Sequence, residues 1–241
     1  TLAFELTSGR RPLIVSCGSG AHLGPDWHRA GRATPSHSTL CLGGYSSARL
    51  GKPVKTSGVY RELLVEAPKI VPVEMSQTAE GVKFEGAHSG YVPPFGLTHA
   101  RKLSLSLDGR SLAGEDLLIA LDDTAGNAGE TVLSDDINPN VDFQIRFHLH
   151  PEVDAALDLG GTTVAIAAKS GEIWIFRHES KLSLTIEPGV YLEKNQPIPR
   201  SSRQIVLSGM INDALTRAQW SLSKTQDTAM AIRDLRLEEL R

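Results

Sequence analysis

Short segments that alternate apolar and polar residues, separated by turn residues, constrain the fold of this chain more than any other feature. Residues 103–107 alternate Leu and Ser, and the pair Asp108 and Gly109 follows them before the apolar residues resume. Glycine accepts the positive φ that tight hairpin turns require. A second Gly-containing turn separates residues 164–168 from residues 173–176. Repeated hairpins at a spacing of roughly 8 to 12 residues are typical of an antiparallel β-sandwich.

We therefore predict an all-β fold, an antiparallel β-sandwich of two or more layered sheets. Leu2, Phe4 and Leu6 alternate with other residues ahead of a turn and the apolar run 13–15, which predicts a first hairpin. Further strands are expected near 38–42, 61–67, 68–77, 81–88, 98–107, 116–122, 142–150, 162–168, 172–178, 182–190 and 202–209.

Three stretches depart from this pattern. Residues 18–37 are rich in Gly, Pro and Ser and are expected to form a long loop, and loops of this length often carry function. Residues 127–139 are polar and are also expected to be a loop. Residues 225–241 contain no Gly or Pro and space apolar residues as a short C-terminal helix does. We divide the chain into a β-sandwich domain over 1–224 and a helical tail over 225–241.

Charge and hydropathy exclude some classes of partner. The net charge of −3 and pI of about 6.2 give no electrostatic reason to expect nucleic acid, although a local basic groove could still meet an acidic sugar. No run approaches the roughly 18 apolar residues that span a bilayer, and no signal-peptide pattern opens the chain. We expect no membrane insertion.

The chain starts without Met inside an alternating segment, so we expect further residues upstream. Cys17 and Cys41 are expected to be free, partly buried thiols, with a single disulfide as the alternative.

Two histidines lie on one face of the predicted strand 142–150. Strand alternation places Arg146, His148 and His150 on the side opposite to the apolar residues. The two imidazoles are then about 7 Å apart, which suits a shared metal or an anionic ligand held with Arg146. The alternative, which we favour, is an ordinary exposed polar strand face.

A second group of candidates is His88, Tyr91, His99 and Arg101. These residues could line a sugar cleft, with Tyr91 stacked on a pyranose ring and the cations on carboxylate or sulfate groups. A Tyr beside a His also has the composition of the acid and base of a lyase. In the alternative reading they anchor loops, with Tyr91 and His99 hydrogen-bonded where two sheets or domains meet.

Two residues around the long loop complete the candidates. His37 could reach a metal ion from a sheet edge, or serve as an ordinary structural histidine. Trp27 lies in the loop and is a candidate for contact with a sugar or another domain, whereas Trp174 lies in an alternating strand and is expected in the core.

The segments 32–42, 88–118, 143–154 and 203–209, in this order and spacing, resemble the C-terminal β-domain of the heparinase II/III-like polysaccharide lyases over about residues 2–222. The resemblance implies a supersandwich-like β-domain that follows an N-terminal α/α toroid. It also implies β-elimination of uronic-acid-containing polysaccharides, including glycosaminoglycans, and export to the periplasm or the extracellular space. The catalytic Tyr and Asn or Glu of such enzymes come from the toroid, and a catalytic His comes from just upstream of the first strand. The chain alone is therefore expected to be inactive.

The resemblance further implies a zinc site to which His37 would contribute. Ser38 stands where the family motif has Asn, and Ser16 stands at the position of an Asp ligand. Because a hydroxyl is a poorer zinc ligand than a carboxylate, Ser16 argues against occupancy.

Three functions are thus open: the cleft wall of a lyase, a carbohydrate-binding or purely structural β-domain, and a degenerate lyase-like protein. An exposed apolar patch near His37 and His88, together with an exposed Trp27, would indicate a docked domain. A concave groove of aromatics and cations would indicate a self-contained binding module.

Overall fold

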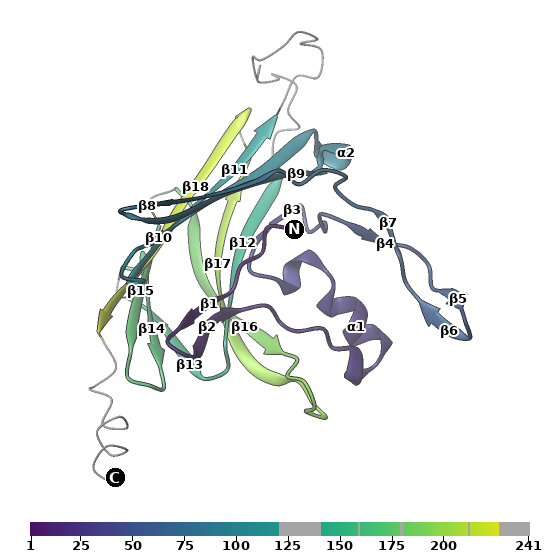
Figure 1. The fold of residues 1–241 in the computed structure, drawn as a ribbon, viewed down its shortest axis with the longest axis horizontal. Coiled ribbons are helices and arrows are strands. Elements are labelled where there is room, and N and C mark those ends of the chain that lie inside the picture. The colour runs from purple at the N-terminus through teal and green to yellow at the C-terminus, as the bar shows by residue number, and fades with distance from the viewer. Residues whose placement is uncertain (121–140, 159, 179–180, 212, 227–241) are drawn as a thin grey trace.

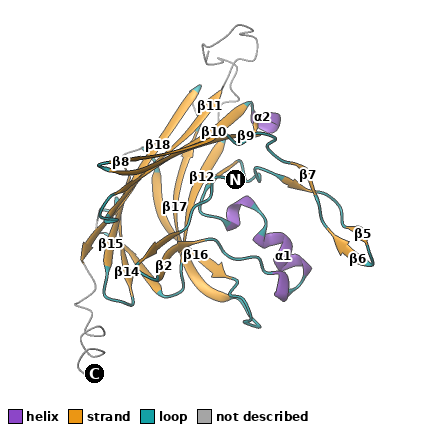
Figure 2. Ribbon diagram, viewed as in Figure 1, coloured by secondary structure: helices purple, strands orange, loops and turns teal. Residues whose placement is uncertain are grey.

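A computed structural model describes residues 1–120, 141–158, 160–178, 181–211 and 213–226. Antiparallel sheets make up most of this structure, and helices are few and short (Figures 1 and 2). The all-β prediction is confirmed. No helix among the described residues is long and apolar enough to cross a membrane.

The larger sheet has eight antiparallel strands in the order β13-β14-β15-β18-β11-β10-β9-β8. Its strands are β8 (Val73–Thr78), β9 (Gly81–Tyr91), β10 (Leu97–Ser106), β11 (Ser111–Ala120), β13 (Val153–Leu157), β14 (Thr163–Ala168), β15 (Ile173–His178) and β18 (Leu215–Gln226).

The second sheet has six strands in the order β1-β2-β12-β17-β16, with β3 also paired to β12. Its strands are β1 (Leu6–Ser8), β2 (Arg11–Val15), β3 (Leu40–Leu42), β12 (Asp142–Leu149), β16 (Ser183–Tyr191) and β17 (Arg200–Met210). The core lies between the two sheets. It combines Ile145, Phe147 and Leu207 of the second sheet with Trp174, Phe176 and other side chains of the larger one. Trp174 is therefore a core residue, as expected.

Two small additions flank the sandwich. Residues 49–66, which we call the arm, contain β4 (Arg49–Leu50) paired to β7 (Leu64–Glu66) and β5 (Val54–Thr56) paired to β6 (Val59–Arg61). The arm projects from the body beside α1 (Figure 1). The helical elements are η1 (Ala21–Leu23), α1 (Pro25–Gly31), η2 (Thr34–Ser36) and α2 (Val92–Phe95).

The structure confirms both sequence-predicted hairpins. Leu105 pairs with Leu112 across the turn at Gly109, which has a φ of 67°. Ala167 pairs with Ile173 across the turn at Gly171, which has a φ of 90°. The first hairpin also forms, but its strand begins at Leu6 rather than at residue 1.

Other expectations need correction. The segment 18–37 was expected to be a loop, but it contains the helix α1. Pro25 and Asp26 lie in the first turn of this helix, where proline and acidic residues are favoured. The strands β13 and β18 were missed. β18 continues to Gln226 and so includes the first two residues of the expected helical tail. The rest of that tail and the predicted loop 127–139 lie outside the described residues. Cys17 and Cys41 are free and buried, as expected.

Candidate functional site

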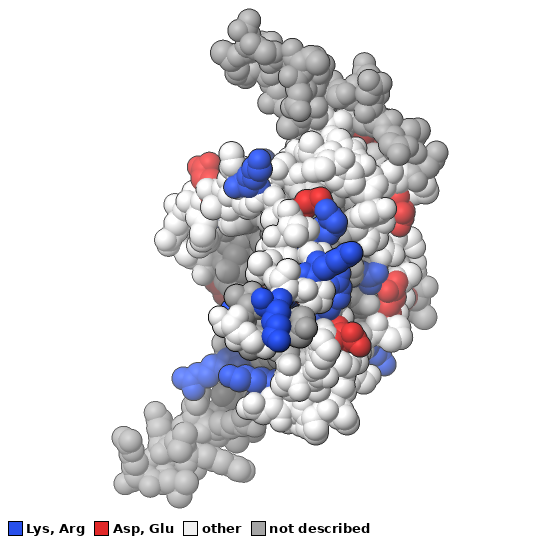
Figure 3. Space-filling model, turned by 90° about the vertical axis from the view of Figure 1, so that its right-hand side faces the viewer, with Lys and Arg blue, Asp and Glu red and all other residues white. Residues whose placement is uncertain are grey.

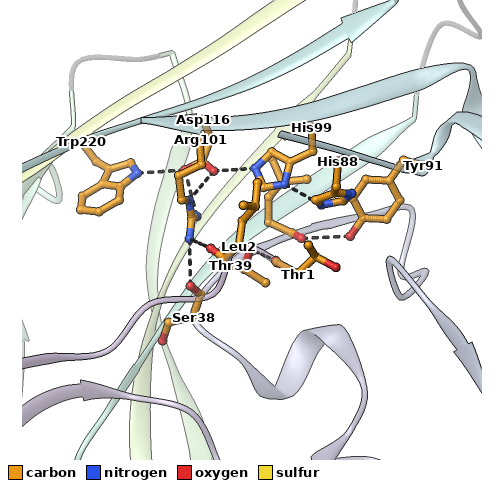
Figure 4. A network of polar contacts seen from close by, with 11 residues as sticks. Thr1, Leu2, Ser38, Thr39, His88, Tyr91, His99, Arg101, Asp116 and Trp220 are labelled. Atoms are coloured by element: carbon orange, nitrogen blue, oxygen red, sulfur yellow. Dashed lines mark hydrogen bonds and ion pairs between the residues drawn. The ribbon is translucent and has the colours of Figure 1, made fainter. Parts of the chain in front are cut away.

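A buried polar network joins the eight-stranded sheet to the segments that cover it (Figure 4). Arg101 on β10 and Asp116 on β11 are directly paired strand neighbours. The Arg101 Nε and Nη2 atoms donate to the two oxygens of Asp116 at 2.8 and 3.0 Å. Asp116 also accepts from His99 Nε2 at 2.7 Å and from Trp220 Nε1 at 3.0 Å. Four donors thus surround one carboxylate, which keeps it ionised although it is buried.

The network extends through two histidines whose tautomers follow from their partners. Because Asp116 accepts from His99 Nε2, the neutral His99 ring has an unprotonated Nδ1. That atom lies 3.1 Å from His88 Nε2, which must therefore be the donor. His88 Nδ1 accepts in turn from the backbone N–H of Gly90 at 3.1 Å. Both rings are satisfied only when they are neutral.

Arg101 also holds the start of the chain in place. Its Nη1 donates to the carbonyl oxygens of Leu2 and Ser38, both at 2.9 Å. Phe4 lies under the guanidinium, 5.6 Å from ring centroid to Cζ, and stacks on Trp220. The arginine therefore links the larger sheet to two segments of the opposite layer.

Tyr91 makes a similar link between the sheets. Its hydroxyl donates to the carbonyl oxygen of Leu40 on β3 at 3.0 Å. Its ring lies against His88, with 5.4 Å between centroids. Burial raises the pKa of Tyr91 above its usual value, so the hydroxyl remains a donor.

The four residues of this network that were candidates from the sequence are shielded from solvent. His88 is 2% exposed, and Tyr91, His99 and Arg101 are fully buried. Desolvation lowers the pKa of His88 to about 3 and lowers that of His99. The neighbouring Arg101 and His99 hold the pKa of Asp116 well below its usual range, against the effect of burial. These contacts agree with the alternative reading, in which the four residues anchor loops where the two sheets meet. A role at a substrate cleft or a domain interface stays a prediction, since contact with a sugar requires the covering segments to move.

Sequence reasoning missed Asp116 and Trp220, and of these two Asp116 carried a signal. Asp116 interrupts an apolar strand at an inward-facing position, and a buried carboxylate needs a cation. Trp220 lies on β18, which was not predicted.

His148 on β12 and His150, just after this strand, have different partners and do not face a common ligand site. His148 Nε2 lies 2.8 Å from the carbonyl oxygen of Pro35, and its Nδ1 lies 3.4 Å from the Cys17 sulfur. Burial lowers the pKa of His148 to about 4. His150 instead accepts from the N–H of Glu152 and packs on Tyr191. The favoured reading of an exposed polar face is therefore wrong for His148, because the segment that contains Pro35 covers it.

A family model described as heparinase II/III-like, C-terminal matches residues 1–221. The chain belongs to this family. FtsZ-localized protein C of Caulobacter vibrioides is 30% identical over 234 residues, which are 93% of this chain and 37% of that protein. The crystal structure of the heparan sulfate lyase HepC from Pedobacter heparinus matches with a TM-score of 0.68 at 13% identity, over 94% of this chain and 30% of the enzyme. A heparinase III structure matches with a TM-score of 0.65 at 12% identity, over 95% of this chain and 30% of that enzyme. The likeness to these enzymes shows the fold, and the chain spans about a third of the length of its relatives.

The zinc site that the heparinase II/III-like resemblance implies finds little support in the described residues. His37 is half-buried, and burial lowers its pKa. Ser16 offers no carboxylate, and its N–H binds the side chain of Glu5. Within the described ranges, no group of three His, Cys, Asp or Glu side chains is arranged to hold a metal ion. Zinc at His37 stays a prediction and would need ligands from elsewhere in a longer protein.

The segment from β7 to β8 of this heparinase II/III-like domain exposes several large apolar side chains, and we call this segment the apolar strip. We define it by six large apolar side chains, each between 55% and 74% exposed: Leu63, Leu64, Val65, Ile70, Val73 and Met75. A cavity of about 670 Å³ lies beside the strip, lined by Val65, Tyr45, Ser47 and three prolines. Trp27 on α1 is 36% exposed. Single exposed apolar residues are common on protein surfaces, but six large ones within 13 residues make this segment a candidate for contact with another domain or molecule.

Proposed function

We propose that this chain is the C-terminal β-domain of a longer heparinase II/III-like polysaccharide lyase. In that protein it completes one wall of the substrate cleft and supports an upstream α/α toroid. The observation that carries the proposal is the exposed apolar strip, which covers the connection from β7 to β8 as well as part of both strands. A self-contained sugar-binding module has no need of six exposed large apolar side chains in one stretch of 13 residues.

The start of the chain supports the same assignment. The Thr1 nitrogen lies 3.2 Å from the Ser47 hydroxyl, and Ser47 lines the cavity beside the apolar strip. A preceding domain would therefore join the chain next to the strip. The contacts of Arg101 with Leu2 and Ser38 would fix the angle at which that domain meets the sandwich.

The proposed substrate is an acidic polysaccharide, cleaved by β-elimination. That reaction needs a base to remove the C5 proton and an acid for the leaving oxygen, both held against the sugar. In this chain His88, His99 and Tyr91 are buried and have hydrogen-bond partners within the protein. We therefore expect the chain by itself to have no lyase activity.

The test compares the full-length gene product with the 241-residue chain. Both are incubated with heparin, heparan sulfate, chondroitin sulfate and alginate, and the absorbance of the unsaturated uronate product is followed. Activity of the longer protein and none of the chain is the expected result. Product formation by the 241-residue chain alone would refute the claim that catalysis needs the upstream domain. Absence of product from both proteins with every polysaccharide would refute the lyase assignment. Cell fractionation then tests the periplasmic or extracellular location that a lyase of this kind implies.

A second candidate is a degenerate lyase-like protein that keeps the fold without the chemistry. Two observations favour it: Ser16 replaces the expected Asp ligand, and the relative at 30% identity is named for localization with FtsZ rather than for a lyase activity. Co-sedimentation of the full-length protein with polymerised FtsZ, and imaging of a fluorescent fusion in dividing cells, test this alternative. Localization at the division site without lyase activity would favour it over the first candidate.

A further inference from the structure

A groove of about 510 Å³ lies on the eight-stranded sheet, on the strands that carry the buried network. Strand pairing places five of its lining residues in one row across β9, β10, β11, β18 and β15. In order across the sheet, the row consists of Lys83, Ser104, Ala113, Ser221 and Arg177. Lys83 and Arg177 at its ends are exposed, whereas the core-side neighbours Phe176 and Trp220 point inward. The groove therefore opens on the face away from the core.

The row has the dimensions of an elongated ligand. Four steps between neighbouring strands separate Lys83 from Arg177, which is about 19 Å at the usual strand spacing. Between these two cations the floor consists of two serines and an alanine, so no large side chain blocks the path. A single sugar ring cannot bridge the two ends, whereas an extended oligosaccharide can.

The charge that the groove offers to a ligand is positive. Its two carboxylates already have partners: Glu85 lies 3.6 Å from Lys102, and Glu115 accepts from Gln219 and lies 3.3 Å from Arg217. Within the described part of the chain, neither Lys83 nor Arg177 makes an ion pair. Two cations at a fixed separation thus remain available for anionic groups.

The floor of the groove is rigid, which lowers the cost of binding. Arg101 and Asp116 lie on the opposite face of β10 and β11 and tie these strands to each other. Trp220 packs directly against Gly114 beneath the floor, so close that a Cβ on Gly114 would lie 2.1 Å from its ring. The cations at the rim are therefore carried by strands that cannot easily shift.

We propose that this groove binds an acidic oligosaccharide laid across the strands, with carboxylate or sulfate groups on Lys83 and Arg177 and sugar hydroxyls on Ser104 and Ser221. The site is non-catalytic and would hold the polymer that a catalytic domain cleaves. It rests on the proposed function only for the class of ligand. Single-stranded nucleic acid fits less well, because its bases need an exposed aromatic platform and Trp220 points into the core.

The arm offers a second cationic surface and hence a matched control. Figure 3 shows the face that carries the arm, on which Lys and Arg side chains gather. Arg29 and Arg49 are paired there with Glu62 and Glu66, respectively. The apolar strip adjoins these residues, which suits a protein contact better than a sugar.

The experiment measures binding of a heparin hexasaccharide, an alginate hexasaccharide and neutral maltohexaose to the 241-residue chain by calorimetry. We expect the two acidic probes to bind and the neutral one not to. The double variant K83A/R177A should weaken binding about tenfold, since it removes two exposed ion pairs. The control K52A/R61A, which removes two exposed cations from the arm, should leave the Kd unchanged.

Each other outcome would overturn the proposal. Absence of binding, equal affinity for neutral maltohexaose, or equal losses in both double variants would each show that the groove is no site for acidic sugars. The lyase assay of the full-length protein is an independent readout. K83A/R177A should leave turnover of short substrates intact, and binding by the chain would stand even if the full-length protein proved inactive.

Discussion

Replacing Asp116 with Asn removes one negative charge from the buried network and keeps the shape of the side chain. One oxygen of Asp116 accepts from His99 and Arg101, and the other accepts from Arg101 and Trp220. Whichever way the amide is turned, its NH2 group therefore faces two N–H donors. The variant also leaves the fully buried Arg101 without its counter-ion.

The loss of one partner from a buried ion pair costs about 3–5 kcal/mol, because a charge is left without compensation. Domains are stable by only about 5–15 kcal/mol, so Asp116→Asn should remove a large share of the total. Urea unfolding followed by tryptophan fluorescence measures this as a fall in the midpoint at constant slope. A loss that large would place the network among the main determinants of stability in this domain.

The control is Glu115→Gln, one residue away on the other face of β11. Glu115 pairs with Arg217, which is 55% exposed, so its loss should cost no more than about 1 kcal/mol. If Asp116→Asn were no more destabilising than this control, the network would not hold the sheets together and the reasoning would be wrong.

Three further predictions concern stability and reactivity. Burial lowers the pKa of His88 to about 3 and of His148 to about 4, so the unfolded chain takes up protons first as pH falls below 6.5. These two histidines alone should lower the free energy of unfolding by up to about 2.7 kcal/mol per pH unit between about pH 6.5 and 4, and a flat profile in urea titrations would contradict this. Gly114→Ala should lower the melting temperature, at a cost of about 1–3 kcal/mol, because its Cβ meets the ring of Trp220 at 2.1 Å. Burial raises the pKa of both cysteines to about 11, so a thiol reagent should label them slowly in the native protein and rapidly after denaturation; rapid native labelling would show that they are accessible.

The fold class could be predicted because each antiparallel hairpin has a recognisable pattern within a short stretch of sequence. Turn residues and alternation mark each hairpin within about ten residues, so β10 with β11 and β14 with β15 could be read directly. The order of strands within a sheet has no such signature. β18 lies between β15 and β11, which are distant from it in the sequence, and only tertiary packing selects these neighbours.

The central ion pair of the network, Arg101 with Asp116, could also have been predicted from the sequence. Counting outwards from the Asp108 and Gly109 turn places Arg101 opposite Asp116, and alternation puts both on the face that carries Leu112 and Leu118. A cation and a carboxylate facing each other on the core side of a hairpin indicate a buried ion pair.

The partners that complete the network were not predictable in this way. The carbonyl oxygens of Leu2 and Ser38 come from segments 99 and 63 residues away from Arg101, and the indole of Trp220 from 104 residues beyond Asp116. Backbone carbonyls carry no sequence signal, since every residue has one. Yet Arg101 has more donors than Asp116 can accept, so its remaining N–H groups had to find oxygens in whatever covers the sheet. The same excess of donors ties the eight-stranded sheet to the backbone of Leu2 and Ser38, and so links the stability of the sandwich to the position of these two segments.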